Sequence, residues 1–98
     1  MRKVQMYVIY DKVGQMVAGW PYKAMNDGEA LRTFKNILED PNSTLSRNPH
    51  DFTLLHVGEF DQVDGTVKGF EIQKKVTEGA SIIKINGQSN NGEEDLPL

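Results

Sequence analysis

Asn26-Asp-Gly-Glu-Ala-Leu-Arg-Thr-Phe-Lys-Asn-Ile-Leu38 is the stretch of the 98-residue sequence that decides the fold. Asn26 is a favourable N-cap residue, and Glu29 follows it at the spacing of a capping box. Pro41 disfavours helical geometry at the residue before it, so the helix must end there. The stretch therefore predicts one amphipathic helix, whose apolar side chains recur at i, i+4, i+7 and i+8: Ala30, Phe34, Ile37 and Leu38.

Two segments before this helix are rich in β-branched and aromatic residues, which favours strands. They span residues 4–10 and 15–20. Gly14 can supply a positive φ in the turn between them. Pro21 either ends the second strand or places it at a sheet edge.

Two further strands are predicted after the helix, at residues 52–60 and 66–72. The pair Asp64-Gly65 favours a tight turn between them. Residues 81–85 are a candidate for one more strand. The element order β-β-α-β-β predicts the α+β class, with one helix packed on a face of an antiparallel sheet. The other face is then wet, capped by a dimer partner, or curled into a barrel.

Composition indicates a globular chain with 38% hydrophobic and 26% charged residues. We expect a single folded domain over residues 1–85, a polar flexible linker at 86–92 and an acidic–hydrophobic tip at 93–98. No apolar run is long enough for a membrane span, and no signal sequence opens the chain. With no Cys, a disulfide frame and a thiol nucleophile are excluded, and a reducing cytoplasm is permitted.

The net charge of −3 comes from the tail, because the 11 Lys and Arg residues are matched by the acidic residues of the folded body. A neutral body lacks the basic face that a strong duplex-DNA binder needs. Any site for a polyanion must therefore be local.

A block in the middle of the chain matches a known pattern in residue type, order and spacing. It resembles the small nonstructural protein of the gokushovirus-type microviruses, which are phages with single-stranded DNA genomes. The resemblance implies a nonstructural or DNA-binding protein that acts in the host bacterial cytoplasm while genomes are made and packaged. The matching residues are Pro21-Tyr22, Asn26-Asp-Gly-Glu-Ala-Leu-Arg32, Phe34, Asp40-Pro41, Pro49-His-Asp-Phe52, Leu54 and Gly58-Glu-Phe-Asp61.

The last six residues, Glu93, Glu94, Asp95, Leu96, Pro97 and Leu98, are similar to the tails of bacterial single-stranded DNA-binding proteins. The resemblance implies docking into basic-rimmed apolar pockets of replication enzymes. The two leucines can serve as apolar anchors, while the carboxylates can steer the tip to a basic rim. The alternative is a tail that only keeps the protein soluble. Unlike those tails, this one ends in Leu rather than in an aromatic residue.

The first 23 residues combine aromatic rings with four cations and one acidic residue. Binding of single strands needs rings for base stacking and cations along the backbone. We therefore predict a single-stranded DNA site formed by Arg2, Lys3, Tyr7, Tyr10, Lys12, Trp20, Tyr22 and Lys23. The alternative is that the rings fill a core. Alternation along the strand predicts that Tyr7 and Tyr10 face opposite ways.

Other polar residues favour structural roles. Lys68, Lys74 and Lys75, with Phe70 between them, are more typical of a solvated sheet edge than of a second binding site. His56 is predicted to be a hydrogen-bonded histidine in the core. The histidines and acidic residues do not form a metal-ligand pattern, so we expect no metal, no cofactor and no enzymatic activity.

The sequence thus favours a phage nonstructural protein that binds single-stranded DNA during genome replication or single-strand production. Its tip would recruit a host or phage replication protein. A homodimer is favoured by the uncovered sheet face and by the gain when two weak sites share one strand. The alternative is a protein–protein adaptor of phage replication or assembly that makes no direct DNA contact.

Overall fold

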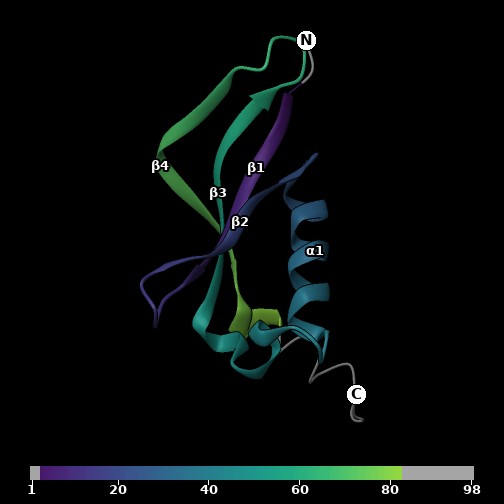
Figure 1. Cartoon of the computed structure of the whole chain (residues 1–98), viewed down its shortest axis with the longest axis vertical. Coiled ribbons are helices and arrows are strands. Elements are labelled where there is room, and N and C mark those ends of the chain that lie inside the picture. Colours follow the sequence, from purple (N-terminus) through teal and green to yellow (C-terminus); the bar gives the residue numbers. More distant parts are fainter. Residues whose placement is uncertain (1–2, 83–98) are drawn as a thin grey trace.

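A computed structural model describes residues 3–82 of the chain. Four strands and one long helix form the body, and two short 3-10 turns connect the helix to the third strand (Figure 1). In chain order the elements are β1 (Lys3–Asp11), β2 (Met16–Ala24), α1 (Asp27–Glu39), η1 (Thr44–Arg47), η2 (Pro49–Asp51), β3 (Phe52–Asp61) and β4 (Val67–Glu78).

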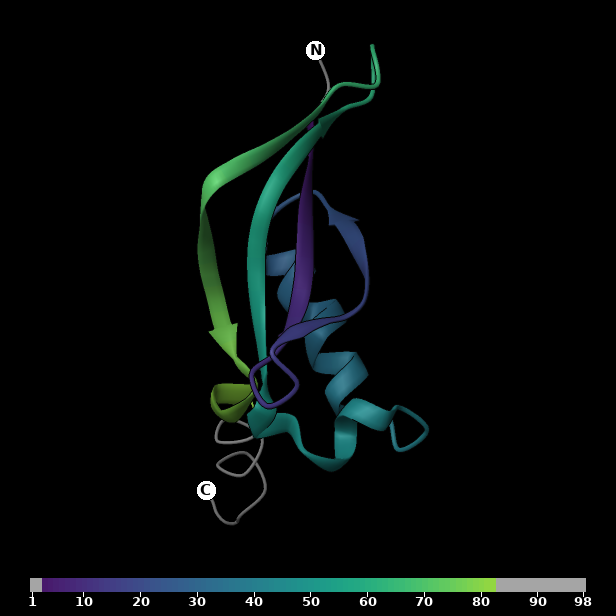
Figure 2. The ribbon, with the colours of Figure 1, turned by 60° about the vertical axis from the view of Figure 1, so that its left-hand side comes forward.

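The four strands form one antiparallel sheet in the order β2-β1-β3-β4. Helix α1 packs on one face of this sheet, and Figure 2 shows the sheet in front of the helix. No helix packs on the opposite face within the part of the chain that the structure describes. The predicted α+β class is therefore confirmed. Among residues 3–82, no helix has the length and apolar content needed to cross a bilayer.

The predicted helix starts and stops where the sequence places its caps. The Asn26 side chain accepts a hydrogen bond of 2.9 Å from the Glu29 backbone N–H. The Glu29 carboxylate in turn accepts from the backbone N–H of Met25, and not from that of Asn26. At the other end Asp40 is extended, with φ −79° and ψ 114°, because it precedes Pro41. The capping box is thus formed with its second bond displaced by one residue.

The core lies between α1 and the helix-facing side of the sheet. Its largest fully buried side chains are Tyr7, Phe34 and Leu54, one from each of β1, α1 and β3. The apolar stripe predicted for the helix contributes three buried residues. The complete buried cluster is Tyr7, Ile9, Ala24, Ala30, Phe34, Leu38, Phe52, Leu54 and Ile82.

Both edge strands arch away from the sheet. In β2 the arch is formed by residues 19–21, which face Val8 alone on β1, and Gly19 has φ +76°. The strand resumes after this arch, so β2 extends past Pro21 to Ala24 and is longer than predicted. In β4, residues 70–73 face Val57 alone on β3.

The turn between β1 and β2 differs from the prediction. Gln15, not Gly14, has the positive φ, at 58°. The Asp11 carboxylate accepts hydrogen bonds of 3.0 Å from the backbone N–H groups of Val13 and Gly14. A Cβ on Gly14 would lie 2.9 Å from an Asp11 carboxylate oxygen. A side chain at position 14 would therefore displace the Asp11 carboxylate, and Gly14 is not used for a positive φ.

The end of the described chain is helical, and not extended. Residues 79–82 continue from β4 as a helical turn, and Ile82 is buried in the core at 3% exposure. The candidate strand at residues 81–85 is thus wrong for its first two residues, because packing of Ile82 against the core replaces sheet pairing. Residues 83–85, the linker at 86–92 and the tip at 93–98 lie outside the described residues.

Candidate nucleic-acid interface

Tyr7 belongs to the core and does not contribute to a surface site. Its ring is 0% exposed, and its hydroxyl donates a hydrogen bond of 2.7 Å to Asp27 at the start of α1. Burial, and then this hydrogen bond to a carboxylate, raise the pKa of Tyr7 well above its ordinary value. The predicted stacking role of Tyr7 is therefore wrong, because the helix covers its ring.

Tyr22 is also fixed by helix α1. Its hydroxyl donates a hydrogen bond of 2.8 Å to the backbone carbonyl of Ala30 in α1, and its ring centroid lies 6.0 Å from that of Tyr7. Burial raises the pKa of Tyr22 to about 12. Its ring is partly buried against the core cluster, so at most an edge of it is available to a ligand.

Trp20 is the most exposed of the large hydrophobic residues in the described part of the chain, at 89%. It lies in the arch of β2, where the strand leaves its partner. Beside it is a groove of about 510 Å³ between β2, α1 and η1, and no charged side chain lines this groove. Its lining residues are Ile9, Ala18, Gly19, Trp20, Tyr22, Thr33, Ile37, Thr44 and Leu45.

Tyr10 lies on the face of the sheet that α1 leaves uncovered. Ile9 points into the core, so alternation along β1 places Tyr10 on the opposite side. Tyr10 is paired with Val17 on β2 and with Thr53 on β3, and all three side chains share that face. The prediction that Tyr7 and Tyr10 face opposite ways is therefore confirmed, and the four predicted rings do not form one platform.

The predicted cations also do not form one group. Lys3 forms an ion pair of 3.1 Å with Glu59, and Lys12 forms one of 2.9 Å with Glu78. Lys23 is exposed and forms no ion pair within residues 3–82. Exposed ion pairs contribute little, about 0–1 kcal/mol, so both paired lysines remain accessible to a competing anion. Arg2 lies outside the described residues.

The strongest polar cluster of the uncovered face centres on Glu78, which sequence reasoning did not single out. Its carboxylate accepts hydrogen bonds from Lys12 at 2.9 Å, Thr53 at 2.8 Å and Lys75 at 3.1 Å. The bonds from Lys12 and Thr53, in that order, do most to lower the pKa of Glu78, to about 2. These donors come from the β1–β2 turn, β3 and β4, so only the folded sheet brings them together.

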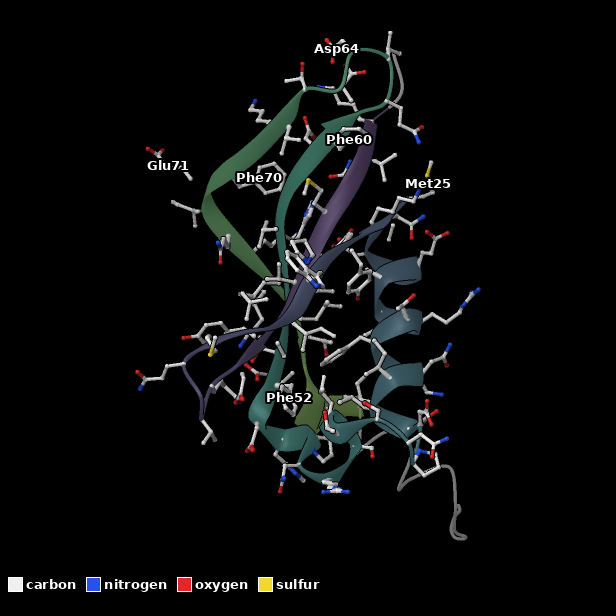
Figure 3. The ribbon with its side chains drawn as sticks, in the orientation of Figure 1. Met25, Phe52, Phe60, Asp64, Phe70 and Glu71 are labelled. Atoms are coloured by element: carbon white, nitrogen blue, oxygen red, sulfur yellow. The ribbon has the colours of Figure 1, made fainter. Side chains whose placement is uncertain are left out.

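The second basic group lies on the edge strand β4, where all three of its lysines are exposed. Lys74 lies 3.7 Å from the Asp27 carboxylate. Phe70 points from β4 toward β3, while Glu71 points away (Figure 3). The Phe70 ring meets the His56 ring edge-on at 4.7 Å. Of this group, only Lys75 joins the cluster at Glu78.

His56 is hydrogen-bonded, as predicted, but it is only partly buried and lies beside the core cluster, not in it. Its side chain is 13% exposed, its ring stacks on Tyr7 at 4.8 Å, and its Nε2 lies 2.8 Å from the Gln5 side-chain oxygen. Within the described range, His, Asp and Glu side chains form no group of three that could hold a metal ion.

The chain matches the model of a known protein family. The model of a family described as Phage ORF5 protein matches residues 4–82, which include all four strands and the helix. No curated protein shows significant similarity to the chain, and neither does any solved structure.

Proposed function

We propose that this chain, which belongs to the Phage ORF5 protein family, is a nonstructural protein that binds single-stranded DNA during phage genome replication or single-strand production. The observation that carries the proposal is the grouping of Tyr10 with Lys12 and Lys75 on the uncovered sheet face. A ring flanked by ammonium groups is the combination that single-strand binding requires. The resemblance to gokushovirus-type proteins supports the same role, because those phages have single-stranded genomes.

The chemistry of this face suits weak binding without sequence choice. A base can stack on Tyr10, at about 1–3 kcal/mol per base, while Lys12 and Lys75 contact the neighbouring phosphates. Lys23 lies on the edge strand β2, where it is paired with Met6 of β1, and it can extend the row of cations. Trp20 offers a second ring at the edge of β2. Because these lysines contact phosphates, we expect the affinity to fall with added salt, with a log–log slope of about −0.7 for each phosphate contact.

Trp20 provides the first test, since it is the only Trp in the chain. Its emission is recorded while oligo-dT is added to the full chain at low salt. Quenching that disappears with added salt is expected if the strand passes the β2 edge. The proposal would be overturned if oligo-dT did not quench Trp20 and if a single-stranded DNA column did not retain the full chain at low salt.

A second candidate function, a protein–protein adaptor without DNA contact, is favoured by the groove beside Trp20. The groove is lined by apolar and uncharged side chains, which suits an apolar segment of a protein better than a phosphate backbone. Exposed Trp residues are also common at the centres of protein interfaces. If the protein is such an adaptor, Trp20→Ala should abolish capture of the protein partner and Tyr10→Leu should leave it intact, and neither variant nor the original chain should bind oligo-dT.

The C-terminal tip, Glu93 to Leu98, lies outside the described residues. Our proposal that it recruits a host or phage replication protein is supported by its sequence alone. A chain that ends at Gly92 should lose capture of the partner, with oligo-dT affinity unchanged or higher. If the truncation changes neither property, the tip only keeps the protein soluble.

We further propose that the protein works as a homodimer in the host bacterial cytoplasm and has no enzymatic activity. Two copies on one strand would convert two weak contacts into one stronger attachment. The exposed apolar side chains of Val13, Met16, Val17 and Trp20 support an interface between copies. Sedimentation that shows only monomers at high protein concentration would contradict the dimer.

A further inference from the structure

The cluster at Glu78 has the composition of an anion-binding site that already contains an anion. Two ammonium groups and one hydroxyl, from three separate elements, direct their hydrogen bonds to the two oxygens of one carboxylate. Charge-assisted bonds of this kind bind carboxylates and phosphates alike. Thr53 is 5% exposed, so its hydroxyl is fixed by the packing around it.

The ion pair at Glu59 is simpler, because its carboxylate is paired with one lysine, Lys3. At Glu78 one lysine comes from the β1–β2 turn and the other from β4, and their side chains are 46% and 60% exposed. Solvent and ligands can therefore reach both ammonium groups.

The position of the cluster connects it to the proposed DNA site. Tyr10 is paired with Thr53, and Thr53 is paired with Glu78, so the three side chains form one row across the sheet. Neighbouring side chains in such a row lie about 5 Å apart, so Glu78 is two such steps, roughly 10 Å, from Tyr10. A strand with one base stacked on Tyr10 can therefore bring a backbone phosphate to the carboxylate of Glu78.

We propose that Glu78 is a built-in competitor, whose carboxylate occupies the position that a backbone phosphate of single-stranded DNA takes between Lys12, Lys75 and Thr53. This inference rests on the proposed function. Binding of the strand requires the carboxylate to leave its three donors, which lowers affinity and favours rapid release. Asp11 is the other acidic residue next to Lys12, and its carboxylate remains bonded to the turn.

The test compares two variants that each remove one negative charge. Glu78→Gln frees both lysines of the cluster, whereas Glu59→Gln frees Lys3 at the far end of the sheet. Binding of labelled oligo-dT is measured by fluorescence anisotropy at several salt concentrations. We expect Glu78→Gln to tighten binding about tenfold at low salt and to steepen the salt dependence by about 0.7 per added phosphate contact. Glu59→Gln should change the affinity no more than about twofold.

A third variant separates geometry from charge. Glu78→Asp keeps the charge but shortens the side chain, so the carboxylate withdraws from at least one donor. It should tighten binding by less than Glu78→Gln does. Adding Lys12→Gln to Glu78→Gln should remove most of the gain. Thermal unfolding establishes that each variant is folded.

Three results would overturn the inference. Equal tightening by Glu78→Gln and Glu59→Gln would show an effect of net charge alone. If both Glu78 variants bound as well as or more weakly than the original chain, and the original chain bound normally, Glu78 would not be a competitor. The proposed function would remain intact. Absence of binding by every variant would overturn both. Binding by Glu78→Gln alone, with none by the original chain, would support the competitor and show that it dominates the site.

Discussion

The hydroxyl of Tyr7 on β1 donates a hydrogen bond of 2.7 Å to the Asp27 carboxylate, which begins α1. This bond connects an inner strand of the sheet to the first turn of the only long helix among residues 3–82. The phenol ring is fully buried, while Asp27 stays in contact with solvent and with Lys74. Tyr7 therefore fixes the helix to the sheet, and its aromatic ring is not available to a ligand.

Tyr7→Phe should destabilise the fold without disturbing its packing. The substitution removes one hydrogen bond to a charged acceptor, which is worth about 1–2 kcal/mol. Chemical denaturation measures the change in the free energy of unfolding. A change close to zero would show that the bond between β1 and α1 contributes nothing.

The two tyrosines that point toward the helix should make the fold sensitive to alkali. Burial raises the pKa of Tyr22 from 10 to about 12, and the pKa of Tyr7 also rises. The unfolded chain loses these protons first, so their contribution is complete below pH 10 and declines as the pH rises above it. Unfolding measured between pH 9 and about 12 should show this loss. Tyr7→Phe should reduce the loss, while Tyr10→Phe serves as the control on the other face.

Gly58 is required because the backbone of β4 lies against it. A Cβ at this position would lie 2.5 Å from the Lys68 carbonyl oxygen and 3.2 Å from the Gly69 Cα. Gly58→Ala must therefore separate β3 from β4 and should cost about 1–3 kcal/mol. Its cross-strand partner Gly69 has open space, with nothing within 4 Å of where a Cβ would lie, so Gly69→Ala should change stability by less than about 0.5 kcal/mol. Equal effects in thermal unfolding would contradict this difference.

Glu78 should give the fold a specific sensitivity to acid. Its pKa falls from 4.5 to about 2 on folding, chiefly because Lys12 and Thr53 donate to the ionised carboxylate. The stabilisation is therefore complete above pH 4.5 and is lost as the pH falls toward about 2. Glu78→Gln should flatten the dependence of unfolding free energy on pH across this window. An unchanged slope would mean that the cluster around Glu78 does not persist in solution.

Trp20 should be neutral for stability, because it is 89% exposed. Ile72, in the arch of the opposite edge strand, is 84% exposed and provides a matched control. Both alanine substitutions should change the free energy of unfolding by less than about 0.5 kcal/mol. Only Trp20→Ala is expected to weaken binding of a ligand at the β2 edge.

Local sequence patterns predict the elements well, and they fail where distant parts of the chain meet. Asn26, Glu29 and Pro41 define the ends of α1 through bonds within a few residues. Alternation correctly separates Tyr7 from Tyr10. The helical turn at residues 79–82 could not be predicted, because Ile82 is placed by contact with the core and not by its own neighbours.

The candidate site shows the same division. Composition identified the rings and cations of the first hairpin, but not which of them the helix covers. The partners of Lys3 and Lys12 are 56 and 66 residues away in the sequence, and no local pattern connects them. Glu78 was missed for the same reason, since its donors converge only after β3 pairs with both neighbouring strands.

Binding of labelled oligo-dT to the full chain and to Tyr10→Leu, at low and at physiological salt, decides whether the uncovered face of the sheet holds a single-strand site. We predict binding by the original chain that weakens strongly with salt, and a loss of about 1–3 kcal/mol of binding free energy in Tyr10→Leu. Trp20→Ala, Tyr10→Leu and the original chain should all be folded to the same extent. Equal affinity of the Tyr10 variant and the original chain, or binding that does not respond to salt, would contradict such a site.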